Sequence, residues 1–600
     1  MKRTIFVLVC GVVVVALALL FLPSGREQLR AAKSYLKFQK YVTQIDGTLY
    51  QSNAMIEMQD GVRLATDVYL PHLPAANLPT VLVRLPYGKR RYYEARHWVD
   101  LFLPQGFAVV VQDMRGRWRS EGIFAPYPNA AGDGASTLDW IVDQVWSNGQ
   151  IGTIGCSALG ESQIILAATR HPAHRAMIPI GAGGAIGTAR NDYGFFGFFE
   201  GGIPALASGV GWFASYGGKT SGDMGPPRID PPSVLTSLPL RDAVATARNN
   251  ATDFETLLDR FGKSGGFEDW GYISDGDRFD VPTLLIDTWY DQAVQSTLAM
   301  ADLIAETSTS VQTIIAPGTH CDTEGAFYAG QLGDLPVVGS ARKELDDVYV
   351  AFMAHHLNGA PSPQLAAFNT YVLGEDRWLE SASWPPEGAA KSVWRLSGNR
   401  LLTLHQNGEP FSVRSFSSDP QNPVPTLGGA ACCTGDPTMR NGPLFQNQIE
   451  ERQDILLFTS DPVSEPLRIV GPVTARVFVS TDAPDTDLVL RLTDVDPKGR
   501  SLLVQEGALR LRYRDGFTNP TLMQLGQIYE VTVRMRDIAW LVKPGHKLRL
   551  HIAGSSFPRL SLNMNGGGNP HLETVLNTAM ISIHMSADAP SVLTLFTLPD

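Results

Sequence analysis

Cysteine is scarce in this sequence of 600 residues, which contains only five. A count this low excludes a scaffold stapled by many disulfides, and no local spacing of cysteine and histidine matches that of a zinc site. We interpret Cys156 and Cys321 as small buried thiols, although export of the chain would permit disulfides. Cys432 and Cys433 are adjacent, and the sequence leaves their state open.

Charge is also scarce, and basic charge in particular. Charged residues make up 18% of the chain, and the formal net charge is -11. This balance gives no electrostatic reason to bind nucleic acid. Hydrophobic residues make up 44%, which predicts two or three domains with large cores. A short basic cluster, interpreted as a solvated loop, consists of Lys89, Arg90, Arg91 and Arg96.

Residues 1–25 have the features of an export signal. Lys2 and Arg3 precede an apolar stretch from Ile5 to Leu22, which approaches the ~18 or more residues of a membrane-spanning helix. Basic residues before such a stretch stay in the cytoplasm, so we expect a signal anchor with the folded domains outside the cytoplasmic membrane. The alternative is a signal peptide cleaved at the small residues Ala16 and Ala18, which would give a secreted protein.

Apolar runs alternate with helical patterns over residues 45–185, and the alternation resumes over residues 276–368. Runs that are apolar on both faces are typical of strands in a parallel sheet covered on both sides. The two segments together predict one doubly wound, mostly parallel sheet of an α/β protein. The clearest strand candidates are residues 80–85, 106–113 and 149–155, and the clearest helix candidate between them is residues 131–149.

Two further regions differ in character from this sheet. Residues 186–275 are predicted to form a largely helical cap inserted into the α/β domain. Residues 369–600 contain short alternating strands separated by proline, glycine and aspartate turns, which predicts an all-β jelly-roll domain. Aromatic residues of the cap fit either a substrate pocket or plain core, and they are Phe195, Phe196, Phe198, Phe199, Trp212, Phe213 and Tyr216.

A serine stands where the third strand candidate ends and a helix begins. In an α/β-hydrolase the nucleophile occupies such a turn, and small residues beside it leave its hydroxyl exposed. The usual pattern is G-x-S-x-G, but here Leu159 takes the second glycine position and the glycine follows at Gly160. The local pattern therefore leaves two interpretations of Ser157, a nucleophile or a helix N-cap.

An acid and a histidine follow in the order that an α/β-hydrolase requires, after later strands. Asp291 comes after the apolar run "TLLID", and His320 comes after "TIIAPGT". Asp287 is an alternative to Asp291 in the same segment. Of the other histidines, His97, His171 and His174 are interpreted as surface residues.

A set of longer motifs runs in order from about residue 50 to the C-terminus, and they are "LPYGK", "QDMRGRWRSEG", "WIVDQVWSNGQIGTIGCSALG", "DTWYD", "APGTH", "PVPTLGG", "GPVTARVFVSTDAPDTDLVLRLTDVDPKGR" and "VKPGHKLRLHIAGSSFPR". With these motifs the chain resembles the CocE/NonD-type serine hydrolases, the family of bacterial cocaine esterase, α-amino-acid ester hydrolases and Xaa-Pro dipeptidyl-peptidases. The resemblance implies an α/β-hydrolase domain, an inserted helical cap and a C-terminal jelly-roll domain.

The resemblance also implies roles for five residues. Ser157 would be the nucleophile, His320 the general base, and Asp291 the acid that orients the imidazole. The backbone N–H of Ala158 and the phenol of Tyr87 would hold the oxyanion. The implied reaction is acylation of the serine followed by hydrolysis, without a cofactor.

Substrate charge is the next expectation. In the amino-ester subgroup, carboxylates two and three residues after the catalytic aspartate hold the substrate ammonium, but this chain has Ala293 and Val294 there. An ammonium buried without a partner is costly, so we expect neutral acyl esters to be preferred. Asp192 or Glu200 of the cap would be other sources of counter-charge.

Three functions are therefore weighed: a carboxylic ester hydrolase, which we favour, an Xaa-Pro dipeptidyl-peptidase acting on short peptides, and an exported binding protein without catalysis. The sequence makes no prediction of oligomeric state. We expect no metal at a cluster of aspartates that lacks the D-x-D-x-D-G spacing of a calcium loop, namely Asp482, Asp485, Asp487, Asp494 and Asp496.

Overall fold

The computed structural model describes residues 49–599, except 73–74, 193–196, 219–233, 249–251, 264–265, 268–269, 309 and 404–410. The predicted signal anchor or signal peptide, residues 1–25, lies outside these residues, as do Phe195 and Phe196. Among the helices that are described, none is long and apolar enough to cross a membrane.

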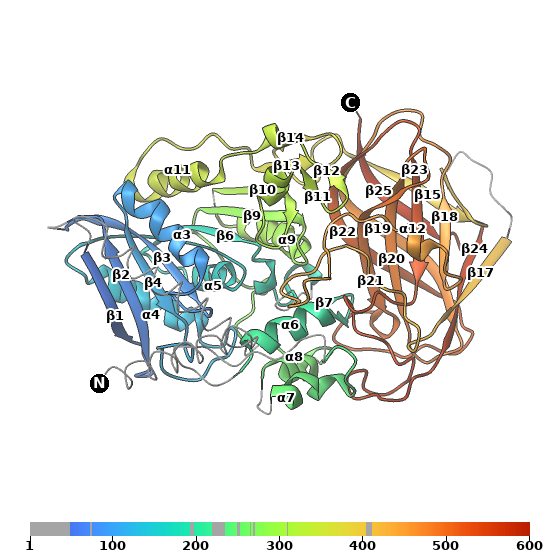
Figure 1. Ribbon diagram of the computed structural model, residues 1–600, viewed down its shortest axis with the longest axis horizontal. Helices are drawn as coiled ribbons and strands as arrows, with labels where there is room; N and C mark the ends of the chain where they lie inside the picture. Colours follow the sequence, from blue (N-terminus) through green and yellow to red (C-terminus); the bar gives the residue numbers. More distant parts are fainter. Residues whose placement is uncertain are drawn as a thin grey trace, which may run out of the picture.

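A ten-stranded sheet forms the first half of the molecule (Figure 1), in the order β1-β2-β4-β3-β5-β6-β9-β10-β13-β14. Pairing is parallel from β4 to β13 and antiparallel towards both edges, which confirms the predicted α/β-hydrolase sheet. The strands are β1 (Leu49–Glu57), β2 (Arg63–Leu70), β3 (Leu78–Leu85), β4 (Ala108–Asp113), β5 (Ser147–Cys156), β6 (His174–Ile180), β9 (Thr283–Tyr290), β10 (Val311–Thr319), β13 (Phe368–Val372) and β14 (Arg377–Ser381).

Helices cover both faces of this sheet. Successive side chains of a strand point to opposite faces, and in β3 Leu82 joins the core on the side of Leu138, whereas Val81 joins the core that contains Trp98 and Phe352. This double coverage explains why the strands read as continuous apolar runs. The helices are α3 (Tyr93–Phe102), α4 (Ala130–Val142), α5 (Ala158–Ala167), α9 (Val294–Ala305) and α11 (Leu345–Asn358).

The basic cluster near residue 90 is not a solvated loop, and this interpretation is corrected. Lys89 is 3% exposed, and its ammonium lies 3.2 Å from a carboxylate oxygen of Asp113. Arg90 pairs with buried Asp67 at 2.7 Å. The two aspartates belong to β4 and β2, so the cations neutralise carboxylates inside the sheet and fix the loop after β3.

The expected cap lies between β6 and β9 in sequence. Its described helices are shorter than the pattern suggested, and a short β-hairpin precedes them in the chain. The elements are β7 (Phe199–Glu200), β8 (Ile203–Pro204), α6 (Leu206–Tyr216), α7 (Ala243–Arg248) and α8 (Phe254–Arg260). In Figure 1 these helices lie between the parallel sheet and the C-terminal domain. The cap can therefore contact both parts of the molecule.

The C-terminal domain is the predicted jelly roll, an eleven-stranded arrangement that is antiparallel except where β16 pairs with β18, and in which β25 pairs with both β15 and β19. The boundary expected at residue 369 falls inside β13, which pairs with β10 of the hydrolase sheet. The strands of the jelly roll are β15 (Ala390–Ser397), β16 (Arg400–Thr403), β17 (Phe411–Ser418), β18 (Ile455–Thr459), β19 (Leu467–Thr481), β20 (Asp487–Val495), β21 (Ser501–Arg510), β22 (Tyr529–Val542), β23 (Lys547–Ala553), β24 (Ala579–Ser586) and β25 (Val592–Leu598).

The C-terminal domain makes hydrogen bonds to the end of β9 and ion pairs with the cap. The hydroxyl of Tyr290 donates to the carbonyls of Leu503 and Val504 in β21, at 3.0 and 2.9 Å. Glu200 of the cap pairs with Arg559, 2.6 Å away, and with Arg536. These buried polar contacts hold the segment that precedes Asp291 against the jelly roll.

The aspartate cluster of the jelly roll is used in pairing and hydrogen bonding. Asp485 pairs with Arg512 at 2.6 Å, and Asp487 pairs with Arg510 at 2.9 Å. Asp496 pairs with Arg500 at 2.8 Å within a turn. The remaining two accept hydrogen bonds, Asp482 from the amide of Met580 and Asp494 from Trp540 and His546.

Candidate active site

Ser157 stands on a sharp turn between β5 and α5. Its backbone has φ 61° and ψ −130°, a region that a residue with a side chain rarely adopts. Its amide donates to the carbonyl of Ile180 at 2.8 Å, which ties the turn to the end of β6. The side chain is partly exposed and makes no capping hydrogen bond to α5. The geometry is that of a nucleophile elbow rather than of a helix N-cap.

The two glycines beside Ser157 are required by close packing. A Cβ at Gly155, whose φ is 148°, would lie 2.5 Å from the Cβ of Leu159. A Cβ at Gly160 would lie 2.7 Å from Ala182 and 2.9 Å from the Gly155 carbonyl. The second glycine of the motif is therefore needed at position 160, and position 159 accepts a leucine that is fully buried.

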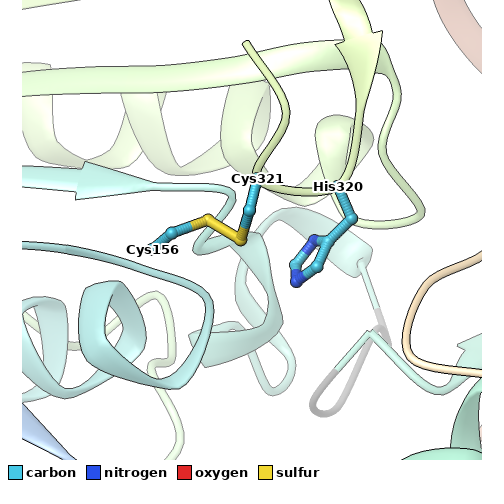
Figure 2. Close-up of side chains that lie close together, drawn as sticks. All are labelled: Cys156, His320 and Cys321. Atoms are coloured by element: carbon cyan, nitrogen blue, oxygen red, sulfur yellow. A yellow bond between two sulfur atoms is a disulfide. The ribbon is translucent and has the colours of Figure 1, made fainter. Parts of the chain in front are cut away.

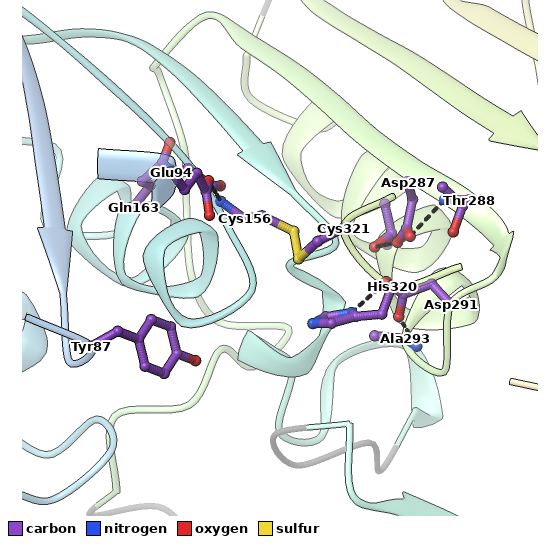
Figure 3. Close-up of a disulfide and its surroundings, with 12 residues drawn as sticks. Tyr87, Glu94, Cys156, Gln163, Asp287, Thr288, Asp291, Ala293, His320 and Cys321 are labelled. Carbon is purple, nitrogen blue, oxygen red and sulfur yellow. Dashed lines mark hydrogen bonds and ion pairs between the residues drawn. A yellow bond between two sulfur atoms is a disulfide. The ribbon is translucent and has the colours of Figure 1, made fainter. Parts of the chain in front are cut away.

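Asp291 and His320 form the acid and histidine pair at the ends of β9 and β10. The Oδ2 atom of Asp291 lies 2.6 Å from Nδ1 of His320, and its Oδ1 accepts the amide of Ala293 at 2.8 Å. Asp287, the alternative, instead accepts the amide of Thr288 at 2.7 Å and the hydroxyl of Thr297. Figure 3 shows both aspartates on the same side of the imidazole.

The charges of this pair stabilise each other. Burial opposes ionisation of both groups, but the ion pair and the hydrogen bond lower the pKa of Asp291 and raise the pKa of His320 above its ordinary value. Burial and the neighbouring Asp291 charge raise the pKa of Asp287 well above its usual range. Burial and the Asp291 carboxylate thus both favour the protonated form of Asp287.

A small cavity is lined by Ser157 and His320. The Nε2 atom of His320 is buried and has no hydrogen-bond partner among the residues that the structure describes. Phe198 and Trp212 line the cavity, whereas Phe213 is core, so the cap aromatics serve both purposes proposed for them. The lining comprises Ser157, Glu161, Gly181, Gly197, Phe198, Trp212, Gln292, Ala293, His320, Cys432 and Cys433.

Of the two expected oxyanion donors, Ala158 directly follows Ser157, and Tyr87 contacts the cavity-lining residue Trp212. Ala158 is the first residue of α5, where a backbone N–H has no acceptor within its own helix. The hydroxyl of Tyr87 accepts the indole N–H of Trp212 at 3.1 Å, which leaves its own proton free to donate. Burial raises the pKa of Tyr87 well above its usual range and keeps that proton in place.

A disulfide joins the residue before Ser157 to the residue after His320 (Figure 2), which corrects the interpretation of two separate thiols. The Cα atoms of Cys156 and Cys321 are 5.9 Å apart, and 165 positions of sequence separate them. Gly181 lies beside this bridge, and a Cβ there would be 2.9 Å from Oδ2 of Asp291. The bridge thus links the elbow covalently to the histidine loop.

Two buried carboxyl groups near the elbow were missed by the sequence analysis. Glu94 of α3 accepts the amide of Cys156 at 2.7 Å (Figure 3), and burial raises the pKa of Glu94 to about 7. Glu161 lies one turn after Ser157 on α5 and accepts the hydroxyl of Tyr127. Burial raises the pKa of Glu161 well above its usual range, so it presents a neutral acid to the cavity.

The other histidines differ partly from expectation. The ring of His97 lies 3.0 Å from Asp346, and that of His171 lies 3.0 Å from Asp139; both pairs are at least partly exposed. His174 is buried rather than on the surface, and it bonds the hydroxyl of Thr153 at 2.9 Å. Its position at the start of β6, where the chain enters the sheet, explains the difference.

Comparisons with known proteins agree with this architecture. A family model described as X-Pro dipeptidyl-peptidase (S15 family) matches residues 60–322, and one described as X-Pro dipeptidyl-peptidase C-terminal non-catalytic domain matches residues 360–594. Cocaine esterase of Rhodococcus sp. (strain MB1 Bresler) is 31% identical over 582 residues, which cover 91% of this chain and 98% of that protein.

Two solved structures are similar over nearly the whole chain. An aminopeptidase from a marine sediment archaeon, Thaumarchaeota archaeon, has a TM-score of 0.80 at 21% identity and covers 93% of this chain and 97% of its own. An α-amino acid ester hydrolase has a TM-score of 0.77 at 23% identity, with 92% and 97% covered. At these identities the two structures establish the shared fold.

The fold and the relatives define a serine hydrolase, an enzyme with an α/β-hydrolase domain and a C-terminal jelly roll. Within that class, the chain belongs to the CocE/NonD family, which includes cocaine esterase.

The first prediction concerns the disulfide. Cys156→Ser/Cys321→Ser should lower the free energy of unfolding by about 2–5 kcal/mol, because the bridge closes a long loop, and should lower kcat by loosening the two loops that it joins. Denaturant unfolding and ester hydrolysis measure the two effects. A reductant should reproduce both losses in the native chain and add nothing in the variant. If thiol titration shows the bridge reduced while stability and kcat stay unchanged, the structural role is contradicted.

Proposed function

We propose that the protein hydrolyses carboxylic esters through an acyl-enzyme formed on Ser157, with His320 as general base and Asp291 as the acid that orients it. The observation that carries this proposal is the 2.6 Å contact between Asp291 and Nδ1 of His320, which directs the other ring nitrogen to the cavity above the elbow. A base held in this way can take a proton from a serine hydroxyl.

The reaction follows from these positions. As Oγ of Ser157 attacks the ester carbonyl carbon, its proton passes to Nε2 of His320, and Asp291 stabilises the imidazolium. The amide of Ala158 and the hydroxyl of Tyr87 donate to the developing oxyanion. The imidazolium then protonates the leaving alcohol. The imidazole next takes a proton from water as the water attacks the acyl-serine, which releases the acid and restores the hydroxyl.

The contact between Ser157 and His320 closes during this cycle. Nε2 has no hydrogen-bond partner among the described residues, and both side chains line the same cavity. Catalytic hydrogen bonds are often long before substrate binds and tighten in the complex.

The charges around the cavity favour a neutral acyl group. The positions after Asp291 that would hold an ammonium are Ala293 and Val294, and Glu200 is already neutralised by two arginines. Among the residues that the structure describes, Glu161 is the one acid in the lining, and burial raises its pKa well above the usual range. A bound ammonium would have to ionise it, which costs free energy in a buried site.

Cleavage of Xaa-Pro dipeptides is the second candidate, and Glu161 is the observation that favours it. The matching family models are described as those of an X-Pro dipeptidyl-peptidase. If a substrate ammonium ionised Glu161, the resulting pair would hold a free N-terminus in the cavity. The same catalytic groups would then cleave an amide.

The second prediction concerns the catalytic residues. Ser157→Ala should lower kcat for p-nitrophenyl butyrate by roughly 10⁴-fold or more and abolish labelling by a fluorophosphonate. Tyr87→Phe should lower kcat by roughly 10²-fold, since it removes one oxyanion donor. The control is Tyr371→Phe in β13. It removes a hydroxyl that donates a hydrogen bond to Asp376 and should keep the native rate. Labelling and turnover of folded Ser157→Ala would disprove the assignment.

The third prediction concerns pH. Because Asp291 raises the pKa of His320 above its ordinary value of 6.5, the protonated and inactive form persists to higher pH. The kcat/KM for a neutral ester should therefore fall as pH decreases, with a midpoint above 6.5. Asp291→Asn should shift this midpoint to lower pH as well as reduce the rate. A native midpoint below 6.5, measured in buffers of constant ionic strength, would contradict the coupling.

The fourth prediction concerns substrate charge. The kcat/KM for p-nitrophenyl butyrate should exceed that for α-amino esters and for Gly-Pro or Ala-Pro anilides, because Glu161 is the one acid among the described lining residues and burial raises its pKa well above the usual range. Glu161→Gln should leave this order unchanged, since it replaces a neutral acid with a neutral amide. If the anilides are the better substrates and Glu161→Gln removes that activity selectively, the peptidase becomes the function.

We also propose that residues 1–25 anchor the protein in the cytoplasmic membrane with the catalytic domains outside, since Lys2 and Arg3 precede the apolar stretch from Ile5 to Leu22. The fifth prediction is that the protein sediments with membranes and is digested by protease added to the outer face of that membrane. Deletion of residues 1–25 should leave it in the cytoplasm. Recovery of the native chain from the soluble cytoplasmic fraction with Met1 intact would refute the proposal.

A further inference from the structure

We infer that the catalytic cavity contains an inhibitory site for a soft divalent metal ion such as Zn²⁺, built from the imidazole of His320 and the thiols of Cys432 and Cys433. These residues each offer one ligand atom, and the three atoms lie within 4.8 Å of one another. The imidazole follows β10 of the hydrolase sheet, whereas the two thiols come from the loop between β17 and β18 of the C-terminal domain. The spacing of cysteine and histidine in the sequence could not reveal this site, because its residues come from two different domains.

The donor set suits zinc. Thiolate sulfur and imidazole nitrogen are the ligands that Zn²⁺ prefers, and three protein ligands with one open position form a recurring type of site. With Zn–S of about 2.3 Å and Zn–N of about 2.0–2.1 Å, tetrahedral ligand atoms are roughly 3.6–3.8 Å apart. The observed spacing of up to 4.8 Å therefore needs only a small contraction.

The imidazole is prepared for a metal by the same contact that prepares it for catalysis. Nδ1 of His320 is held by Asp291 at 2.6 Å, and Nε2 has no hydrogen-bond partner among the described residues. A carboxylate behind the ligating histidine fixes the ring and strengthens it as a ligand in many zinc sites. Binding through Nε2 would occupy the lone pair that takes the serine proton.

Cys432 is a buried free thiol, and Cys433 is an exposed free thiol. Neither is in a disulfide, and both line the cavity with Ser157. Their sulfur atoms and the ligand nitrogen of His320 all lie within 4.8 Å of one another, so one ion can reach all three.

The backbone holds the thiols in this place. The amide of Cys432 donates to the hydroxyl of Ser208 in α6 at 3.2 Å. Gly211, one turn later, allows close approach, because a Cβ there would collide with the carbonyl of Cys433. Cys433 itself has φ 58°, a conformation that places its side chain differently from an extended residue. The pair is thus fixed between the cap and the histidine loop.

Direct binding of metal tests the site without reference to catalysis. The full chain carrying Cys10→Ser, which removes the thiol outside the described residues, is titrated with Cd²⁺ or Co²⁺ while thiolate-to-metal absorption is followed, and Zn²⁺ affinity is obtained by competition with a chelator. We expect one ion per chain. Cys432→Ser/Cys433→Ser should abolish the absorption, and His320→Gln should weaken Zn²⁺ binding roughly tenfold or more. The control His355→Gln/His356→Gln, on α11, should change neither.

Three results would overturn the inference. The first is the absence of thiolate-to-metal absorption in the Cys10→Ser chain that retains Cys432 and Cys433. The second is full Zn²⁺ affinity in Cys432→Ser/Cys433→Ser. The third is loss of binding in Cys156→Ser/Cys321→Ser together with its retention in Cys432→Ser/Cys433→Ser. Thermal unfolding confirms that each variant is folded.

Inhibition is the second measurement, and it rests on the proposed function because it needs His320 to act as the base. Zn²⁺ should inhibit hydrolysis of p-nitrophenyl butyrate, and a chelator should restore the rate. The Cys432→Ser/Cys433→Ser variant, compared with its own metal-free rate, should require at least roughly tenfold more Zn²⁺. Thiol-dependent binding by a chain without esterase activity would refute the proposed function and leave the site. Binding without inhibition of an active chain would refute the inhibitory role.

Discussion

The hydrogen bond between Asp291 and His320 is the contact on which the site depends. Asp291 is completely buried, and an unpaired carboxylate there would cost several kcal/mol, so the fold must bring a cation or donors to it. The imidazole of His320 is that partner, supported by the amide of Ala293 and by Asp287 behind it. The pairing also fixes which ring nitrogen faces the cavity. One contact therefore satisfies a buried carboxylate and fixes the orientation of the imidazole.

The parallel sheet supplies this contact, and the C-terminal domain secures it. β9 and β10 are neighbouring parallel strands, so their carboxyl ends place Asp291 and His320 on adjacent loops. Tyr290, the last residue of β9, donates its hydroxyl to two carbonyls of β21, which anchors the acid loop to the jelly roll. The cap is tied to the same domain through Glu200 and its arginines. The jelly roll thus stabilises a site whose acid and base it does not supply.

The sequence predicted what local pattern and chain order control, and missed what depends on distant partners. The strands, the turn at Ser157 and the order of Asp291 and His320 follow from apolar runs that end in small or polar residues. The prediction of a solvated Lys89 was wrong because its partners, Asp67 and Asp113, lie on strands β2 and β4. Only the folded sheet brings these three residues together. Glu161 follows Ser157 by one helical turn without any motif to mark it, and only the structure, in which it accepts the hydroxyl of Tyr127, places it in the cavity lining.

The opposite states of the two cysteine pairs follow from backbone distance. A disulfide usually needs Cα atoms about 4.4–6.8 Å apart, and those of Cys156 and Cys321 are separated by 5.9 Å. Adjacent residues joined by a trans peptide have Cα atoms only about 3.8 Å apart, which disfavours a bridge between Cys432 and Cys433. The first pair can therefore link the turn at Ser157 to the loop of His320 under oxidising conditions while the second stays as thiols. Of the four cysteines around His320, Cys156 and Cys321 therefore form a disulfide, whereas Cys432 and Cys433 are free thiols.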